Sequence, residues 1–151
     1  MERFRVLVCG GRDYHDKARI GEFLTALSIR VGMFWVIQGG ASGADVLAGD
    51  WGRENGMPVA IVPAHWSFYN KSAGPIRNNW MLELFPHICV AFPGGKGTAD
   101  MIKQAKKGNV PVMEVTASGE LLLSNEVAHR INEYRMYKQV LESENGKDQV
   151  G

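Results

Sequence analysis

The chain has 151 residues, of which 45% are hydrophobic and 22% are charged, and its formal net charge is +1. A chain of this length and composition folds as one globular domain with a buried core, which excludes a disordered or collagen-like protein. The near-zero net charge gives no overall basic footprint for nonspecific nucleic-acid binding, which argues against a nucleic-acid partner.

Apolar and amphipathic segments alternate along the chain. Compact apolar runs predict strands at residues 4–9, 34–37, 58–62, 87–92 and 111–115. Apolar residues three or four positions apart predict helices at residues 16–31, 44–56, 74–84 and 98–107, and a C-terminal helix that includes Val127, Ile131, Tyr134 and Leu141. Residues 63–73 are predicted as an irregular loop. Residues 1–142 therefore form the predicted domain, and residues 143–151 a flexible polar tail.

Strands that alternate with helices indicate βαβ units, in which helices cover both faces of a parallel sheet. The continuous apolar character of the strands fits burial on both faces. We therefore predict an α/β protein: a single Rossmann-like three-layer domain with a mainly parallel sheet of about five strands, plus a C-terminal helix.

The cysteines and histidines indicate structural roles. Cys9 and Cys89 each lie in an apolar strand, so we interpret them as reduced thiols of the core. Their spacing from the four histidines does not match a metal site, so we predict no metal. The sequence contains neither an apolar N-terminal leader nor an apolar run of bilayer length, which predicts a cytoplasmic protein without a membrane partner.

Three of the predicted strands end in a pair of glycines, and two of these loops lead directly into a helix. Because the carboxyl ends of parallel strands meet at one edge of a sheet, we expect the three loops to gather there. A helix N-terminus presents free backbone N–H groups and partial positive charge, and glycine lets that backbone approach a phosphate closely. The loops match neither the phosphate-binding loop of nucleoside triphosphatases nor the Gly-x-Gly-x-x-Gly dinucleotide fingerprint.

Side chains near the loops supply the other candidate contacts. Arg77, early in the third predicted helix, would clamp a phosphate with two hydrogen bonds, or else be a solvated helix arginine. Asp45 and Asp100 closely follow two of the loops, and each would cap a helix, contact ribose hydroxyl groups or act as a general base. The aromatic residues of the irregular loop would stack on a base, close an edge of the core or form a dimer contact; they are Trp66, Phe68 and Tyr69. The predicted ligand-binding residues are Gly10, Gly11, Arg12, Gly39, Gly40, Ser42, Gly43, Asp45, Arg77, Gly94, Gly95, Lys96, Gly97 and Thr98.

These blocks resemble the SLOG superfamily of Rossmann-like proteins, in particular its YspA/YpsA-related (YAcAr-like) branch, a family of bacteria and phages. The resemblance is carried by residues 5–13, 39–45 and 64–100. More distant members of the superfamily are the LONELY GUY-type nucleotide phosphoribohydrolases and the DNA-processing protein A group. The resemblance implies a nucleotide or a nucleotide-derived ligand across the edge of the sheet.

The sequence departs from the phosphoribohydrolases at one catalytic position. Arg77 followed by Met81 is similar to an arginine and methionine on the helix before their glycine loop. Those enzymes carry a glutamate three residues after the loop threonine, where this chain has Met101, with Asp100 one residue earlier. One residue turns a helical side chain by about 100°, so Asp100 is expected to point elsewhere than that glutamate. Arg77 and Asp100 are therefore catalytic candidates only if the chain is a hydrolase.

Three functions stay open at this stage. We favour a sensor, carrier or sequestering protein that binds a nucleotide or an ADP-ribose-like small molecule and requires no cofactor. The alternative is an enzyme that hydrolyses the N-glycosidic bond of a nucleoside monophosphate. A DNA-processing accessory role comes third, because the chain lacks a stripe of basic and aromatic residues. The amphipathic C-terminal helix and the loop aromatics are compatible with a homodimer.

Overall fold

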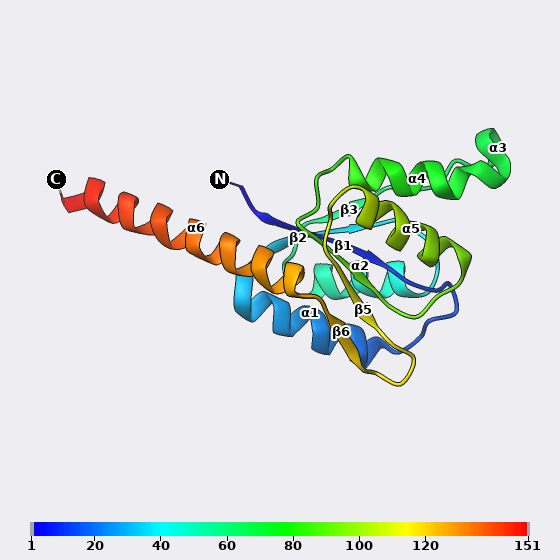
Figure 1. Cartoon of the computed structure of the whole chain (residues 1–151), viewed down its shortest axis with the longest axis horizontal. Coiled ribbons are helices and arrows are strands. Elements are labelled where there is room, and N and C mark those ends of the chain that lie inside the picture. The colour runs from blue at the N-terminus through cyan, green and yellow to red at the C-terminus, as the bar shows by residue number, and fades with distance from the viewer. Residues whose placement is uncertain (1, 151) are drawn as a thin grey trace.

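A computed structural model describes residues 2–150 of the chain. Its centre is a six-stranded sheet in the order β3-β2-β1-β4-β5-β6 (Figure 1). Neighbouring strands from β3 to β5 are parallel, and β6 is antiparallel to β5. The strands are β1 (Phe4–Cys9), β2 (Phe34–Gln38), β3 (Val59–Ile61), β4 (Ile88–Ala91), β5 (Val112–Val115) and β6 (Leu121–Leu123).

Helices cover both faces of this sheet, which confirms the predicted three-layer α/β fold. In Figure 1, α1 and α2 lie on one side of the sheet and α4 and α5 on the other. The helices are α1 (Lys17–Val31), α2 (Ala44–Glu54), α3 (Trp66–Tyr69), a 3₁₀ turn η1 (Asn70–Ser72), α4 (Ala73–Leu82), α5 (Lys96–Lys107) and α6 (Asn125–Val150).

Alternate residues of β1 divide the core into two clusters, because successive side chains of a strand point to opposite faces. Val6 and Val8 belong to the cluster that includes residues of α1, α2 and α6. Leu7 and Cys9 belong to the cluster with residues of α4 and α5. Both faces of the strand are buried, which explains why its sequence is a continuous apolar run rather than an alternating one.

The structure differs from the predicted elements in three places. The sheet has a sixth strand, β6, whose three residues pair with β5 after a short turn. Residues 63–73, predicted as an irregular loop, contain α3, η1 and the start of α4. Residues 143–150, predicted as a flexible tail, continue α6, and α6 has no proline to interrupt the helix.

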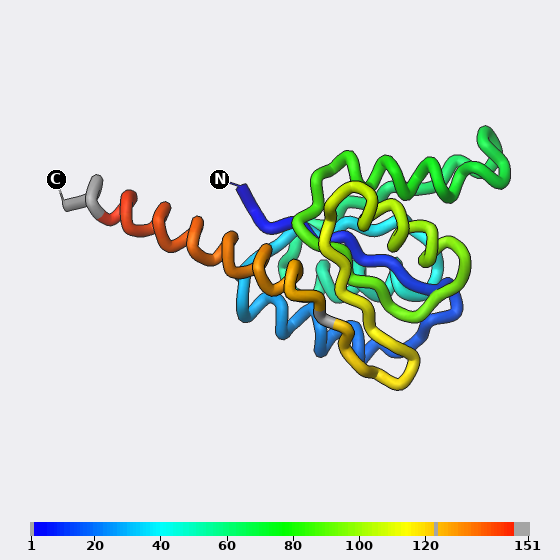
Figure 2. Tube along the Cα trace, in the orientation of Figure 1, coloured from blue at the N-terminus to red at the C-terminus, as the bar shows by residue number. Residues whose placement is uncertain are grey.

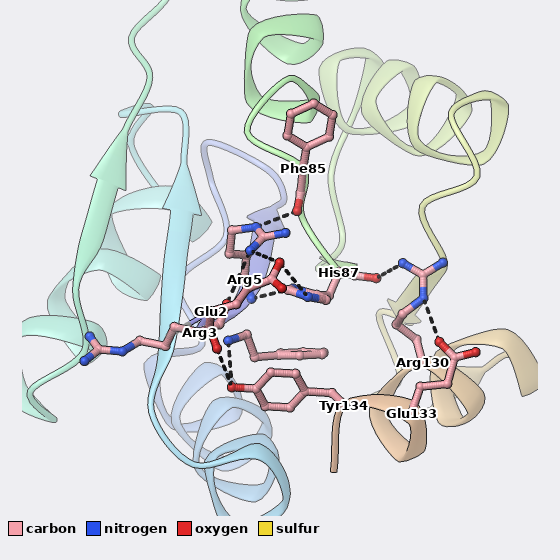
Figure 3. A network of polar contacts seen from close by, with 9 residues as sticks. Glu2, Arg3, Arg5, Phe85, His87, Arg130, Glu133 and Tyr134 are labelled. Carbon is pink, nitrogen blue, oxygen red and sulfur yellow. Dashed lines mark hydrogen bonds and ion pairs between the residues drawn. The ribbon is translucent and has the colours of Figure 1, made fainter. Parts of the chain in front are cut away.

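The chain tube shows α6 leaving the domain at the end opposite to the glycine loops (Figure 2). A polar network attaches the base of this helix to the sheet (Figure 3). The backbone N–H of Phe4 donates to the Tyr134 hydroxyl at 3.1 Å, and the Arg130 guanidinium donates to the His87 carbonyl at 3.3 Å. These hydrogen bonds attach the amino ends of β1 and β4 to α6. The carboxyl ends of both strands, at the opposite edge of the sheet, lead into the glycine loops.

The strand order reverses between β1 and β4, since the chain builds β2 and β3 on one side of β1 and then crosses to the other. In open α/β sheets, ligands bind beyond the carboxyl ends of the strands at such a switch point. The loops after β1 and β4 are therefore the part of this fold where a ligand site is expected.

Candidate functional site

The loops after β1 and β4 are joined directly by their backbones. The N–H of Gly11 donates to the carbonyl of Pro93 at 2.9 Å. A Cβ on Gly10 would lie 2.6 Å from Cβ of Ala44, and one on Gly94 would overlap Oγ1 of Thr98. These two glycines are therefore required by the packing of the loops themselves.

The loop after β2 packs against the loop after β1. The N–H of Ala44 donates to the Gly11 carbonyl at 3.2 Å, and the Ser42 hydroxyl donates to the Arg12 carbonyl at 3.3 Å. Gly43 has a φ of 79° and would collide with the same carbonyls if it carried a Cβ. The three glycine loops thus meet at one edge of the sheet, as the sequence predicts.

Gly95 and Gly97 differ from these packed glycines. A Cβ at either position would meet no atom within 4 Å, and neither residue has a positive φ. Neither loop packing nor backbone strain therefore explains glycine at these two positions. Both residues face a cavity, where a missing side chain leaves the backbone N–H groups accessible to a ligand.

The cavity has a volume of about 860 Å³ and lies over the carboxyl ends of β1 and β4; we call it the main cavity. This is within the size range of small-molecule sites, roughly 300–1,000 Å³. Ten of the predicted ligand-binding residues line it: Gly10, Gly11, Arg12, Asp45, Arg77, Gly94, Gly95, Lys96, Gly97 and Thr98. Three others, Gly39, Gly40 and Ser42, line a smaller neighbouring cavity of about 280 Å³, the side cavity. Gly43 lines neither of the two.

The N-terminus of α5 provides the strongest anion-binding feature of the main cavity. The helix begins at Lys96, directly after Gly95, which has no side chain to cap it. The first backbone N–H groups of a helix have no partner within the helix and carry partial positive charge. The side chains of Lys96 and Thr98 also line the cavity, so a phosphate here would meet backbone, hydroxyl and ammonium donors together.

Arg77 lies on α4 and reaches the loop after β2. Its Nη1 donates to the Gly39 carbonyl at 2.6 Å, and its Nε donates to Oδ1 of Asn78 at 3.2 Å. Burial lowers the pKa of Arg77, the nearby Asp45 carboxylate raises it, and the like charge of Arg12 lowers it. The guanidinium is thus oriented by the protein, and its other N–H groups remain for a ligand.

Asp45 is the buried carboxylate of the main cavity, with 6% of its surface exposed. Its Oδ2 accepts a 3.2 Å hydrogen bond from the N–H of Ala41. Burial raises the pKa of this carboxyl, whereas the Ala41 N–H and the charge of Arg77 lower it. Asp45 thus places a hydrogen-bond acceptor among groups that are otherwise mainly donors, which suits the hydroxyl groups of a ligand.

Asp100 is not among the residues that line the main cavity. Its Oδ2 accepts hydrogen bonds from Nδ2 of Asn78 at 2.9 Å and Nε2 of Gln104 at 2.7 Å. Met101, at the position of the phosphoribohydrolase glutamate, is fully buried in the core cluster between the sheet and α4–α5. The structure therefore brings Arg77 to the cavity but directs Asp100 toward α4.

Asn78 is a cavity residue that sequence reasoning left without a role. Its side chain is 4% exposed, and its Nδ2 donates to the Gly97 carbonyl at 3.2 Å as well as to Asp100. It therefore fixes the glycine loop of α5 against α4. One signal in the sequence could have identified it: Asn78 shares a helical face with Gly74 and Met81, four positions before and three after it, and is the polar member of that buried face.

The aromatic residues of α3 have different surroundings. Trp66 lines the main cavity, and the Arg12 guanidinium lies 5.3 Å from the centre of its ring. Phe68 is 77% exposed and packs edge-on against Tyr69. Trp66 is therefore the aromatic residue of this group that is placed to contact a ligand.

The described residues contain no group of three or more histidine, cysteine, aspartate or glutamate side chains arranged to hold a metal ion. Across the same part of the chain, no helix combines the length and apolar character needed to span a bilayer.

Comparisons with known proteins agree with this architecture. A family model described as YspA, cpYpsA-related SLOG family matches residues 4–69. The Gene 61 protein of Mycobacterium phage D29 is 34% identical over 118 residues, which cover 72% of this chain and 94% of that protein. Among solved structures, the DNA processing protein A (DprA) of Streptococcus pneumoniae matches with a TM-score of 0.60 and 18% sequence identity. That match covers 87% of this chain and 56% of the DprA chain, and it shows a shared fold.

Proposed function

Because the chain belongs to the YspA, cpYpsA-related SLOG family, we propose that it binds a nucleotide-derived small molecule in the main cavity, with a phosphate at the N-terminus of α5. The observation that carries this proposal is the pair Gly95 and Gly97. Both lack a side chain where neither packing nor φ requires it, and both line the cavity. A bound phosphate explains their identity, since it needs close access to the backbone N–H groups.

The remaining contacts follow from the geometry of the cavity. Thr98 and Lys96 add a hydroxyl and an ammonium donor beside the helix N-terminus. The unpaired N–H groups of Arg77 face the same space, where a guanidinium forms paired hydrogen bonds to phosphate oxygens. Asp45 accepts hydrogen bonds from ribose hydroxyl groups of the ligand. The protein then acts as a sensor, carrier or sequestering protein, and the ligand itself is its cargo or signal.

Calorimetric titration of the protein with AMP and ADP tests the proposal, with Gly97→Ala as the informative variant. Alanine at position 97, in the first turn of α5, is expected to raise the free energy of unfolding by roughly 0.5 kcal/mol, because alanine has the higher helix propensity. Gly97 lines the main cavity, and a side chain there is expected to obstruct a phosphate at the helix N-terminus and to lower affinity at least tenfold. A gain in stability together with a loss of affinity separates a ligand-binding glycine from a structural one.

Gly146→Ala in α6 is the matched control, since a Cβ there also meets no atom within 4 Å. It is expected to change stability in the same direction and to leave affinity unchanged. If Gly97→Ala and the unaltered protein bind the nucleotides with equal affinity, the phosphate does not bind at the N-terminus of α5. The absence of binding to either nucleotide would count against the proposed function as a whole.

The alternative function is hydrolysis of the N-glycosidic bond of a nucleoside monophosphate. The position of Asp100 argues against this function. A general acid or base must come within hydrogen-bonding reach of the substrate. Asp100 instead accepts from Asn78 and Gln104. Incubation with AMP is therefore expected to release no free adenine. If the unaltered protein releases adenine and Asp100→Asn does not, the protein is an N-glycosidic hydrolase rather than a binding protein.

We also propose that the partner of this chain, besides the small molecule, is a second copy of itself. The support is the outer side of α6, where Met136 is 66% exposed, Tyr137 43% and Val140 56%. DNA remains the less favoured partner, because the net charge of +1 supplies few phosphate contacts.

A further inference from the structure

A further large cavity lies at the β6 edge of the sheet. It has a volume of about 1190 Å³ and is lined by the end of α5, the loop that follows it, strands β5 and β6, and the start of α6; we call it the edge groove. Leu122 of β6 lies across from Glu114 of β5, and both residues line the groove. Residues paired across antiparallel strands share one face of the sheet. Leu122 is 52% exposed, so this face leaves apolar surface uncovered.

One side of α6 forms a wall of the edge groove and then continues beyond it. Glu126, Arg130 and Glu133 line the groove. Tyr137 and Val140 follow them in α6 at the same alternating spacing of four and three residues, which keeps residues on one side of a helix. Both of these apolar side chains are exposed. A second helix that packs along α6 against Tyr137 and Val140 is therefore directed into the groove.

The distal part of α6 projects away from the domain (Figure 1). We call residues 139–150 the arm. Within the arm, Val140 is exposed, and a Cβ on Gly146 would meet no atom within 4 Å. An isolated helix shorter than about 12–15 residues is only marginally stable in water, and most helices in proteins are stabilised by tertiary packing. A second molecule that packs along the arm would supply contacts that the domain does not.

The arm and the edge groove match in length. The wall of the groove on α6 runs from Glu126 to Glu133, which is about 10 Å at a helical rise of about 1.5 Å per residue. The part of the arm after Glu142 is about 12 Å long by the same measure. In an antiparallel pair of α6 helices that contact each other through Tyr137 and Val140, this part of one copy lies beside the groove wall of the other.

We propose that the edge groove is the docking site for the arm of a second copy of this chain, so that two copies exchange their arms. This inference rests on the proposed self-association through α6, and it adds a contact with β6, which lies outside that helix. The assembly closes at two copies, because each copy offers one arm and one groove and the two contacts are related by a two-fold axis.

Sedimentation velocity of the full chain over a range of concentrations tests the groove. Leu122→Asp places a charge on the apolar surface of the groove and is expected to raise the dissociation constant of the dimer at least tenfold. Ile61→Asp is the matched control, since Ile61 is 48% exposed on β3, the strand at the opposite edge of the sheet. It is expected to leave the dissociation constant unchanged.

Gly146→Pro tests the arm. Proline interrupts a helix, so the variant disrupts the last turns of α6. Because a side chain at this position meets no atom of the domain, the thermal melt of the monomer is expected to stay the same. The dissociation constant of the dimer is expected to rise at least tenfold, although Tyr137 and Val140 are unaltered.

A mixture of the two variants tests whether the arm and the groove bind each other. A mixed dimer joins the intact arm of Leu122→Asp to the intact groove of Gly146→Pro, so it keeps one of the two contacts, whereas each variant alone loses both. With one chain fluorescently labelled, the mixture is expected to form dimers at a concentration at which each variant alone is monomeric.

The outcomes separate this inference from the proposals on which it rests. If Leu122→Asp and Gly146→Pro dimerise like the unaltered chain, or if their mixture associates no better than either alone, the exchange of arms is overturned while the self-association stands. If the unaltered chain is monomeric throughout, the self-association fails, and the inference fails with it. Nucleotide binding in the main cavity is measured separately and is not affected by either result.

Discussion

The backbone N–H of Arg5 donates a 2.9 Å hydrogen bond to Nδ1 of His87, which joins the amino ends of β1 and β4 (Figure 3). This nitrogen accepts only while it carries no proton. The ring also stacks on Phe4, with 4.6 Å between the two ring centres. The pKa of His87 is lowered from 6.5 to about 4, mainly by burial; the positive charges of Arg5 and Arg130 contribute to this shift, and Glu2 opposes it.

The first prediction is a loss of stability in acid that depends on His87. The unfolded chain takes up the proton near pH 6.5, but the folded chain only near pH 4. The free energy of unfolding therefore falls as the pH drops through this window, by about 3 kcal/mol when it is complete. Urea denaturation at pH 7 and at pH 4 measures the difference.

Carboxylates also titrate in this range, so the control is the variant His87→Asn. Its amide oxygen can accept from Arg5 without a pH-dependent charge. The unaltered protein is expected to lose more stability than His87→Asn between the two pH values. Equal losses would mean that the proton on His87 does not affect folding.

The second prediction concerns Gly94 and Gly95, which are neighbours with opposite surroundings. A Cβ at position 94 would overlap Oγ1 of Thr98 and lie 2.7 Å from the backbone nitrogen of Gly11, whereas one at position 95 meets nothing. Gly94→Ala is expected to destabilise the protein by about 1–3 kcal/mol through overpacking. Gly95→Ala is expected to cost only about 0.5–1 kcal/mol, because Gly95 is the N-cap of α5, a position where alanine is less favourable than glycine. Thermal unfolding of both variants checks the contrast, and similar losses at the two positions would contradict it.

The third prediction assigns Asn78 and Asp100 to one structural unit. Asn78 connects Asp100 to the carbonyl of Gly97, and so links α4 to the glycine loop. The single variants Asn78→Ala and Asp100→Ala are each expected to cost about 1–3 kcal/mol, because each leaves a partly buried polar group without its partner. The double variant is expected to cost less than the sum, with a coupling of about 0.5–3 kcal/mol. Additive losses in urea denaturation would show that the two residues act independently.

The outcome at Asp100 illustrates what the sequence can and cannot predict. The glycine loops were predictable because glycine before a helix has a local physical meaning, and the strand order then brings the loops together. The hydrogen bonds of Asp100 depend on α4 lying beside α5, which no local pattern specifies. The helical rotation of about 100° per residue correctly separates Asp100 from the position of Met101, but it does not identify Asn78 as the partner.

Short elements account for most of the other differences. The strand β6 has three residues and α3 has four, too few for a hydrophobic period to be recognised. Both are stabilised by tertiary contacts, β6 by pairing with β5 and α3 by packing against α4. The side cavity was not predictable as a separate space, because its walls come from the loops after β1, β2 and β3 and from the helices α3 and α4.

The fourth prediction is that α6 pairs two copies of the chain. Val127, Ile131 and Tyr134 bury one side of this helix against the domain, and Met136 and Val140, four residues apart, lie on the exposed side. An antiparallel pair of helices centred near Val140 would bury Met136 and Val140 of both copies in one apolar contact, with the two-fold symmetry typical of homodimers.

Sedimentation velocity over a wide concentration range measures this association. The double variant Met136→Ser/Val140→Ser is expected to sediment as a monomer where the unaltered chain is a dimer, because it removes apolar surface that only a partner would cover. Ile29→Ser is the matched control, since Ile29 is 81% exposed on α1 and lies outside α6. If Ile29→Ser also sediments as a monomer, the dimer contact includes α1 and is not specific to α6. If the unaltered chain is monomeric throughout, the exposed side of α6 does not bind a second copy, and ligand binding in the main cavity must be a property of the single chain.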